Sequence, residues 1–77
     1  MINVEEIHKD DYVVFDNGVT VKVANVDLRY AYDLRIDFYK REDLGYKKST
    51  HIWLERPVLA NERVKLVKVL HGDSKQR

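Results

Sequence analysis

The most constraining feature of the sequence is a hairpin signature near its start. Residues 12–15 are aromatic and β-branched, and valine recurs at every second position from Val19 to Val23. Between these segments lies Asp16-Asn17-Gly18, a run of residue types that tolerate positive φ. This arrangement predicts two antiparallel strands, over residues 12–15 and 19–26, joined by a tight turn. We expect a two-residue turn with Gly18 at positive φ.

Two further strands are expected in the middle of the chain. Apolar and polar side chains alternate over residues 34–38, which predicts a half-buried strand. After a turn at residues 40–45, a further strand is expected over residues 48–54, with Ile52 and Leu54 on its apolar face. In the second of these segments His51 and Trp53 lie on the face opposite to the apolar one. The two strands should pair with each other, because the turn between them is short.

The last strand is expected over residues 63–70, where the apolar side chains change register after Leu66. Such a slip predicts a β-bulge. A short helical turn should precede the first strand, since Asn3 and Glu6 have the spacing of a capping box, and another should precede the last strand over residues 58–62. The apolar positions expected in the core are Val14, Val21, Val23, Leu34, Ile36, Phe38, Ile52, Leu54 and Leu66.

Five short strands in a chain of 77 residues favour a small barrel over an open sheet. We therefore expect an all-β, five-stranded SH3-like barrel formed by one domain over residues 1–72, followed by a flexible tail over residues 73–77. An OB-like barrel is the alternative. That fold usually has a helix between its third and fourth strands, and residues 40–47 are too few to hold it.

Two segments resemble parts of SH3-like domains. Residues 7–13 (Ile-His-Lys-Asp-Asp-Tyr-Val) resemble the turn, aspartate and strand with which many bacterial SH3-like domains begin. Residues 60–67 (Ala-Asn-Glu-Arg-Val-Lys-Leu-Val) are similar to the helical turn and last strand of eukaryotic SH3 domains. The resemblance implies the fold only. The peptide-binding aromatics of SH3 domains do not transfer, because Tyr30, Tyr32 and Trp53 differ from that pattern in order and spacing.

The composition favours a cytoplasmic protein without catalytic activity. The chain has no cysteine, so it has neither disulfides nor thiolate metal sites, and no apolar run is long enough to cross a membrane. His8, His51 and His71 are too widely spaced to ligate a metal from one element, and no phosphate-binding loop or nucleophile elbow is present. We expect no metal, no cofactor and no membrane contact.

Aromatic and basic side chains cluster in and after the polar connection at residues 27–33. Tyrosine, tryptophan and arginine are enriched in binding hot spots, and connections of this kind are usually exposed. The candidate partner-binding residues are Arg29, Tyr30, Tyr32, Arg35, Tyr39 and Trp53. The candidate phosphate contacts are Lys40, Arg41, Lys47 and Lys48. The alternative role of the aromatic residues is structural, since so small a domain needs its large side chains for packing.

Two functions remain open at this point. The first is a protein–protein interaction or regulatory domain, which suits a net charge of only +1. The second is a nucleic-acid-binding domain, with aromatic rings stacked on bases and cations along the phosphates. The second half of the chain supports it, because residues 39–77 hold ten Lys and Arg against five Asp and Glu. A protein partner is our first expectation, since acidic residues lie among these cations. The sequence does not indicate the oligomeric state.

Overall fold

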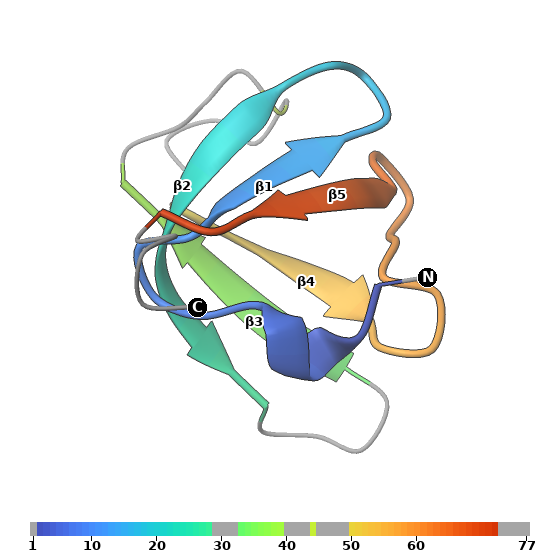
Figure 1. The fold of residues 1–77 in the computed structure, drawn as a ribbon. Helices are drawn as coiled ribbons and strands as arrows, with labels where there is room; N and C mark the ends of the chain where they lie inside the picture. Colours follow the sequence, from blue (N-terminus) through green and yellow to red (C-terminus); the bar gives the residue numbers. More distant parts are fainter. Residues whose placement is uncertain (1, 29–32, 40–43, 45–49, 73–77) are drawn as a thin grey trace.

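The computed structural model describes residues 2–28, 33–39, 44 and 50–72. A short 3-10 helix, η1, precedes five strands that form one antiparallel sheet in the order β4-β3-β2-β1-β5 (Figure 1). The bounds of the elements are η1 Val4–Glu6, β1 Tyr12–Phe15, β2 Thr20–Asp27, β3 Asp33–Phe38, β4 His51–Glu55 and β5 Leu66–Leu70. The all-β class and the five predicted strands are therefore confirmed. In the described part of the chain no helix is long and apolar enough to cross a membrane.

The β1–β2 hairpin has a three-residue loop, so the expected two-residue turn is wrong. The Phe15 N–H donates to the Val19 carbonyl (3.0 Å), and the Gly18 N–H donates to the Phe15 carbonyl (2.9 Å). Of the loop residues Asp16, Asn17 and Gly18, the glycine alone has positive φ, at 86°. This is the common three-residue hairpin loop, in which a turn is followed by one left-handed residue.

The core lies on the inner face of the curved sheet. Phe15 of β1 and Phe38 of β3 pack edge to face, with ring centroids 6.3 Å apart and an interplanar angle of 83°. Eight of the expected core residues are buried: Val21, Val23, Leu34, Ile36, Phe38, Ile52, Leu54 and Leu66. Loops add further buried apolar side chains: Ile7, Leu44, Leu59 and Val64.

Val14 is the exception among the expected core residues. It is only partly buried, whereas Val13 and Phe15 on either side of it are buried. Successive strand residues point to opposite faces, and the Val13–Val21 pair of β1 and β2 sets which face is inner. Positions 13 and 14 are both valine, so residue type alone does not indicate which of the two faces the core. In the structure Val13 shares the inner face with the larger Phe15, and Val14 lies on the other face.

The expected bulge in β5 is confirmed. Val14 is paired with Lys68 while Phe15 is paired with Leu66, so Val67 is the extra residue. The bulge explains how the apolar pattern changes register within one strand.

The two expected helical turns have different outcomes. The N-terminal one is present as η1, although the Asn3 side chain makes no capping hydrogen bond. The one expected over residues 58–62 is absent and is replaced by a hydrogen-bonded turn at 56–59. Both Val58 and Leu59 donate to the Glu55 carbonyl (3.2 and 2.6 Å), and φ of Leu59 is +50°. A left-handed residue stops right-handed helix propagation, and it turns the chain toward β5.

The two edge strands are linked at one end. Ala60 forms isolated antiparallel bridges to Glu55, at the end of β4, and to Lys65, just before β5. The Leu66 N–H also donates to the Leu59 carbonyl (2.9 Å). β4 and β5 are the edge strands of the sheet and are not neighbours in its strand order. The segment from residue 59 to residue 66 connects them through the bridges of Ala60.

Asp11 is the buried charged residue of the described chain, with no exposed surface. Its Oδ2 accepts the His8 N–H (3.0 Å) and lies 3.3 Å from His71 Nδ1, and its Oδ1 accepts the Gly72 N–H (3.3 Å). The carboxylate therefore joins the turn before β1 to the chain after β5. No group of three His, Cys, Asp or Glu residues suited to a metal ion occurs in the part of the chain described. The expected tail at residues 73–77 lies outside that part.

Candidate interaction surface

The outer face of β2, β3 and β4 is polar and carries the single tryptophan. Strand register aligns Asp27 of β2 with Arg35 of β3, and Arg35 with Trp53 of β4. Trp53 is 37% exposed, a large value for so big an apolar side chain. Because Ile52 and Leu54 point into the core, the alternation of β4 places Trp53 outside it.

Arg35 is held in place on this face by Asp37, two residues further along β3. Its Nε donates to Asp37 Oδ1 at 2.7 Å, and Asn25 Nδ2 donates to Asp37 Oδ2 at 3.5 Å. The Arg35 and Asp37 side chains are 33% and 24% exposed, so the ion pair is partly shielded from water. The guanidinium is therefore ordered beside the position of Trp53.

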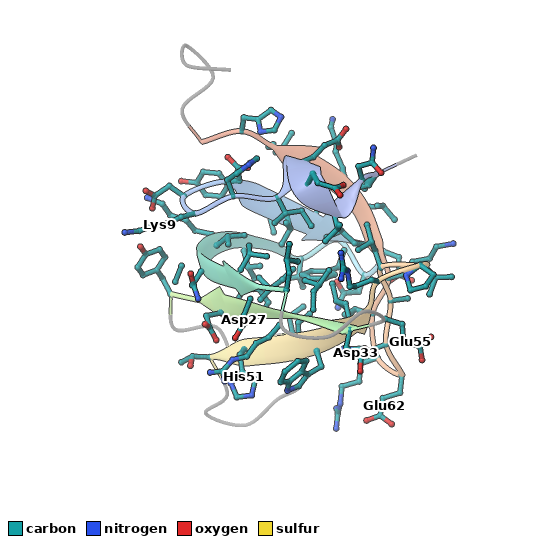
Figure 2. All side chains as sticks on the ribbon, turned by 90° about the horizontal axis from the view of Figure 1, so that it is seen from below. Lys9, Asp27, Asp33, His51, Glu55 and Glu62 are labelled. Atoms are coloured by element: carbon teal, nitrogen blue, oxygen red, sulfur yellow. The ribbon has the colours of Figure 1, made fainter. Side chains whose placement is uncertain are left out.

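A hollow of about 460 Å³ lies against Trp53. The residues that line it are Asp33, His51, Ile52, Trp53, Leu54, Glu55, Asn61 and Glu62. Figure 2 shows Asp33, Glu55 and Glu62 gathered at one end of β3 and β4, with His51 at the other end of β4. The hollow thus combines an aromatic wall with carboxylates on one side.

Asn61 holds in place the side of the hollow that is formed by Asn61 and Glu62. Its Nδ2 donates to the Trp53 carbonyl (3.0 Å), and its Oδ1 accepts the N–H groups of Arg63 (2.7 Å) and Val64 (3.0 Å). Its own N–H donates to the Val64 carbonyl (2.9 Å). Asn61 therefore ties the segment that carries Glu62 to the edge of β4 at Trp53.

Three carboxylates, those of Asp33, Glu55 and Glu62, line the hollow. Asp33 and Glu55 are direct partners across β3 and β4, an arrangement in which like charges destabilise a sheet. Within the described ranges, no Lys, Arg or His side chain makes a salt bridge with Asp33, Glu55 or Glu62. The site is consequently anionic.

The structure brings together only part of the predicted set. Arg35 and Trp53 are neighbours on the outer face, as required for a shared surface. Tyr39 lies elsewhere, past the end of β3. Its hydroxyl is 3.4 Å from Asp10 Oδ1, and Lys22 Nζ is 5.8 Å from its ring centroid.

The same Lys22 amino group is 6.0 Å from the ring centroid of Tyr12, its partner across β1 and β2. The Tyr12, Lys22 and Tyr39 side chains therefore form a separate cluster. The other predicted site residues fall outside the described residues: Arg29, Tyr30, Tyr32, Lys40, Arg41, Lys47 and Lys48.

Sequence analysis missed the acidic half of the hollow. Asp33 and Glu55 each alternate with buried apolar neighbours, a pattern that predicts an outward position but not that the two are paired. The sequence predicts a helical turn at Asn61 and Glu62, and such a turn does not bring them to Trp53. The missing information was the strand register and the turn at 56–59.

Comparisons with known proteins give no guide to this surface, since no family model, curated protein or solved structure shows a significant match to the chain.

Proposed function

We propose that this chain is a non-catalytic interaction or regulatory domain that binds another protein through the outer face of β3 and β4. The observation that supports this proposal is the exposed Trp53, which lies between an ordered arginine and a hollow. Tryptophan and arginine at the centre of a surface are the residue types that most often dominate binding energy. Arg29, Tyr30 and Tyr32 remain predicted members of the same surface.

The charge of the hollow favours a protein over a nucleic acid. Its lining includes three carboxylates and, among the residues described, no lysine or arginine. Phosphate-binding surfaces are instead lined by cations that replace counterions. Arg35, the cation nearest to Trp53 in the strand register, is already paired with Asp37. The predicted phosphate contacts Lys40, Arg41, Lys47 and Lys48 lie outside the described residues.

For the fold, our proposal is an SH3-like barrel in a cytoplasmic protein. Four strands follow one another in the sheet, and β5 returns to pair with β1. The bridges of Ala60 to both Glu55 and Lys65 supply part of the closure that a barrel requires. The absence of cysteine fits a reducing compartment.

A peptide selection followed by NMR mapping tests the proposed function. Peptides selected from a random display library on the immobilised protein should perturb amide signals of Arg35, Asp37, His51 and Trp53. Trp53→Ala should weaken binding by about 2 kcal/mol, as expected of an aromatic hot spot. Tyr39→Ala is the matched control, because it removes an exposed aromatic residue of the other cluster and should leave affinity unchanged.

The stability of each variant must be measured first, so that lost folding is not taken for lost binding. If the selection gives no binder, or if Tyr39→Ala has the larger effect, the proposal is wrong. Gel shifts with single- and double-stranded DNA and RNA at two salt concentrations form the second arm. Tight binding that weakens steeply with salt and survives Trp53→Ala would instead support the nucleic-acid alternative.

A further inference from the structure

We propose that the hollow beside Trp53 receives a lysine or arginine side chain from a basic, extended segment of the partner protein. This inference rests on the proposed function and specifies the chemistry of its partner. It depends on three properties of the hollow: its charge, its aromatic wall and its fixed shape.

The first property is negative charge. Asp33 lies directly opposite Glu55, and Glu62 lines the same hollow. None of the three makes a salt bridge to a cation in the portion of the chain that the structure describes. Two carboxylates held opposite each other weaken a sheet unless a positive charge lies between them. A bound cation supplies that charge, whereas a phosphate or a carboxylate would add to the repulsion.

The second property is the indole ring of Trp53. Tryptophan is the best aromatic partner for a cation, and arginine and lysine carry an aliphatic stem that packs against apolar surface. Ile52 and Leu54 also line the hollow beside the ring, although most of their surface faces the core. A long cationic side chain can therefore place its methylene groups against this wall and its charged end near the carboxylates.

The third property is that the hollow is already formed without a ligand. Asn61 bonds the Trp53 carbonyl and the N–H groups of Arg63 and Val64, and so fixes the segment that bears Glu62. On the other side, the Glu55 N–H donates to the Ala60 carbonyl at 2.8 Å. A site fixed in this way loses little conformational entropy on binding. Its volume of about 460 Å³ is within the range of ordinary ligand sites.

The occupant is assigned to a protein segment because the hollow adjoins Trp53, the residue through which we propose that this face binds a protein. A lysine or arginine side chain that projects from an extended segment can enter the hollow while the rest of that segment lies on the outer face of β3 and β4. A compact cationic metabolite would occupy the hollow alone.

Trp53 provides a direct probe of occupancy, because it is the only tryptophan in the chain. The probe ligands are Ac-Gly-Arg-Gly-Arg-Gly-amide and its glutamate counterpart, each titrated to millimolar concentration. The arginine peptide should change Trp53 fluorescence saturably and shift its indole NMR signal, and the effect should weaken as salt is added. The glutamate peptide should change neither signal.

Matched charge variants localise the effect. Asp33→Asn with Glu55→Gln should weaken the arginine peptide about tenfold, as expected when opposing charges are lost from a contact. Its thermal stability should be equal to or above that of the wild type, because the like-charge pair is removed. Glu5→Gln with Glu6→Gln removes two exposed carboxylates from η1 and should leave the affinity unchanged.

The results separate this inference from the proposed function. In one outcome, library-selected peptides bind at Trp53 while the glutamate peptide binds as well as the arginine peptide. In that case the inferred preference for a cation is wrong, and the proposed protein-binding function is retained. The same conclusion follows if the hollow variant and the η1 variant lose affinity equally. If no selected peptide perturbs Trp53, the proposed function fails and this inference fails with it.

Discussion

Gly72 packs so closely on the carbonyl oxygen of Asp10 that a Cβ added to it would lie 1.8 Å from that oxygen. The glycine is held there by its N–H, which donates to the buried Asp11 carboxylate. The chain after β5 is thus attached to the turn before β1 by a contact that only glycine can make without displacement.

Replacing Asp11 by alanine should destabilise the protein by about 1–3 kcal/mol, because the N–H groups of His8 and Gly72 lose their acceptor. Gly72→Ala should also destabilise it by displacing the chain from Asp10. Chemical denaturation of the two single variants and the double variant gives the coupling. The double variant should lose less than the sum of the two, since both changes break one contact. If the loss of unfolding free energy in the double variant equals the sum of the two single losses, Asp11 and Gly72 stabilise the protein independently.

Phe38→Ala should lower the free energy of unfolding by about 3–5 kcal/mol, since it removes a buried ring and its edge-to-face contact with Phe15. A domain of this size has little stability to spare, so most molecules should be unfolded. Circular dichroism with urea titration measures the loss. Val58→Ala is the control at an exposed apolar position and should change stability by less than about 0.5 kcal/mol.

Gly18→Val should destabilise the β1–β2 hairpin by about 1 kcal/mol or more, because a β-branched residue is strained at a φ of +86°. No neighbouring atom lies within 4 Å of an added Cβ, so the loss reports the backbone alone. Gly18→Asn should lose less, since asparagine tolerates the left-handed region. Thermal melts compare the variants, and equal losses for valine and asparagine would contradict the backbone explanation.

Asn61→Ala should destabilise the protein by about 1–2 kcal/mol, because the turn at residues 61–64 loses its side-chain acceptor. Asn61→Asp keeps the acceptor and loses the donor to the Trp53 carbonyl, so it separates the two roles. Urea unfolding monitored by Trp53 fluorescence measures both variants. We expect Asn61→Asp to recover part of the stability. If both variants unfold like the wild type, Asn61 does not fix the hollow.

The sequence predicted the strands well because their signal is local. The alternation of Leu34, Ile36 and Phe38 with charged residues is complete within one strand, and all three are buried. Errors arose where two local readings were equally good. Positions 13 and 14 are both valine, and a run of Asp, Asn and Gly fits a two-residue or a three-residue loop.

The site was harder to predict because its parts meet through long-range register. Trp53 and Arg35 could be placed on the outer face from alternation alone. The pairing of Asp33 with Glu55 depends on where the β3–β4 hairpin closes, and Asn61 reaches Trp53 only through the left-handed Leu59. Asp11 is an extreme case, since its partners His71 and Gly72 come 60 and 61 positions later in the chain.

The strand order has a consequence for synthesis on the ribosome. The strands from β1 to β4 each pair with a neighbour in sequence, so they can assemble as they emerge. One edge of β1, however, has no partner until β5 is made, because Tyr12 pairs with Leu70. Until then the Tyr12–Phe15 segment presents an open, apolar strand edge of the kind that pairs with other chains. Pairing of β5 with β1 therefore removes this edge from contact with other chains.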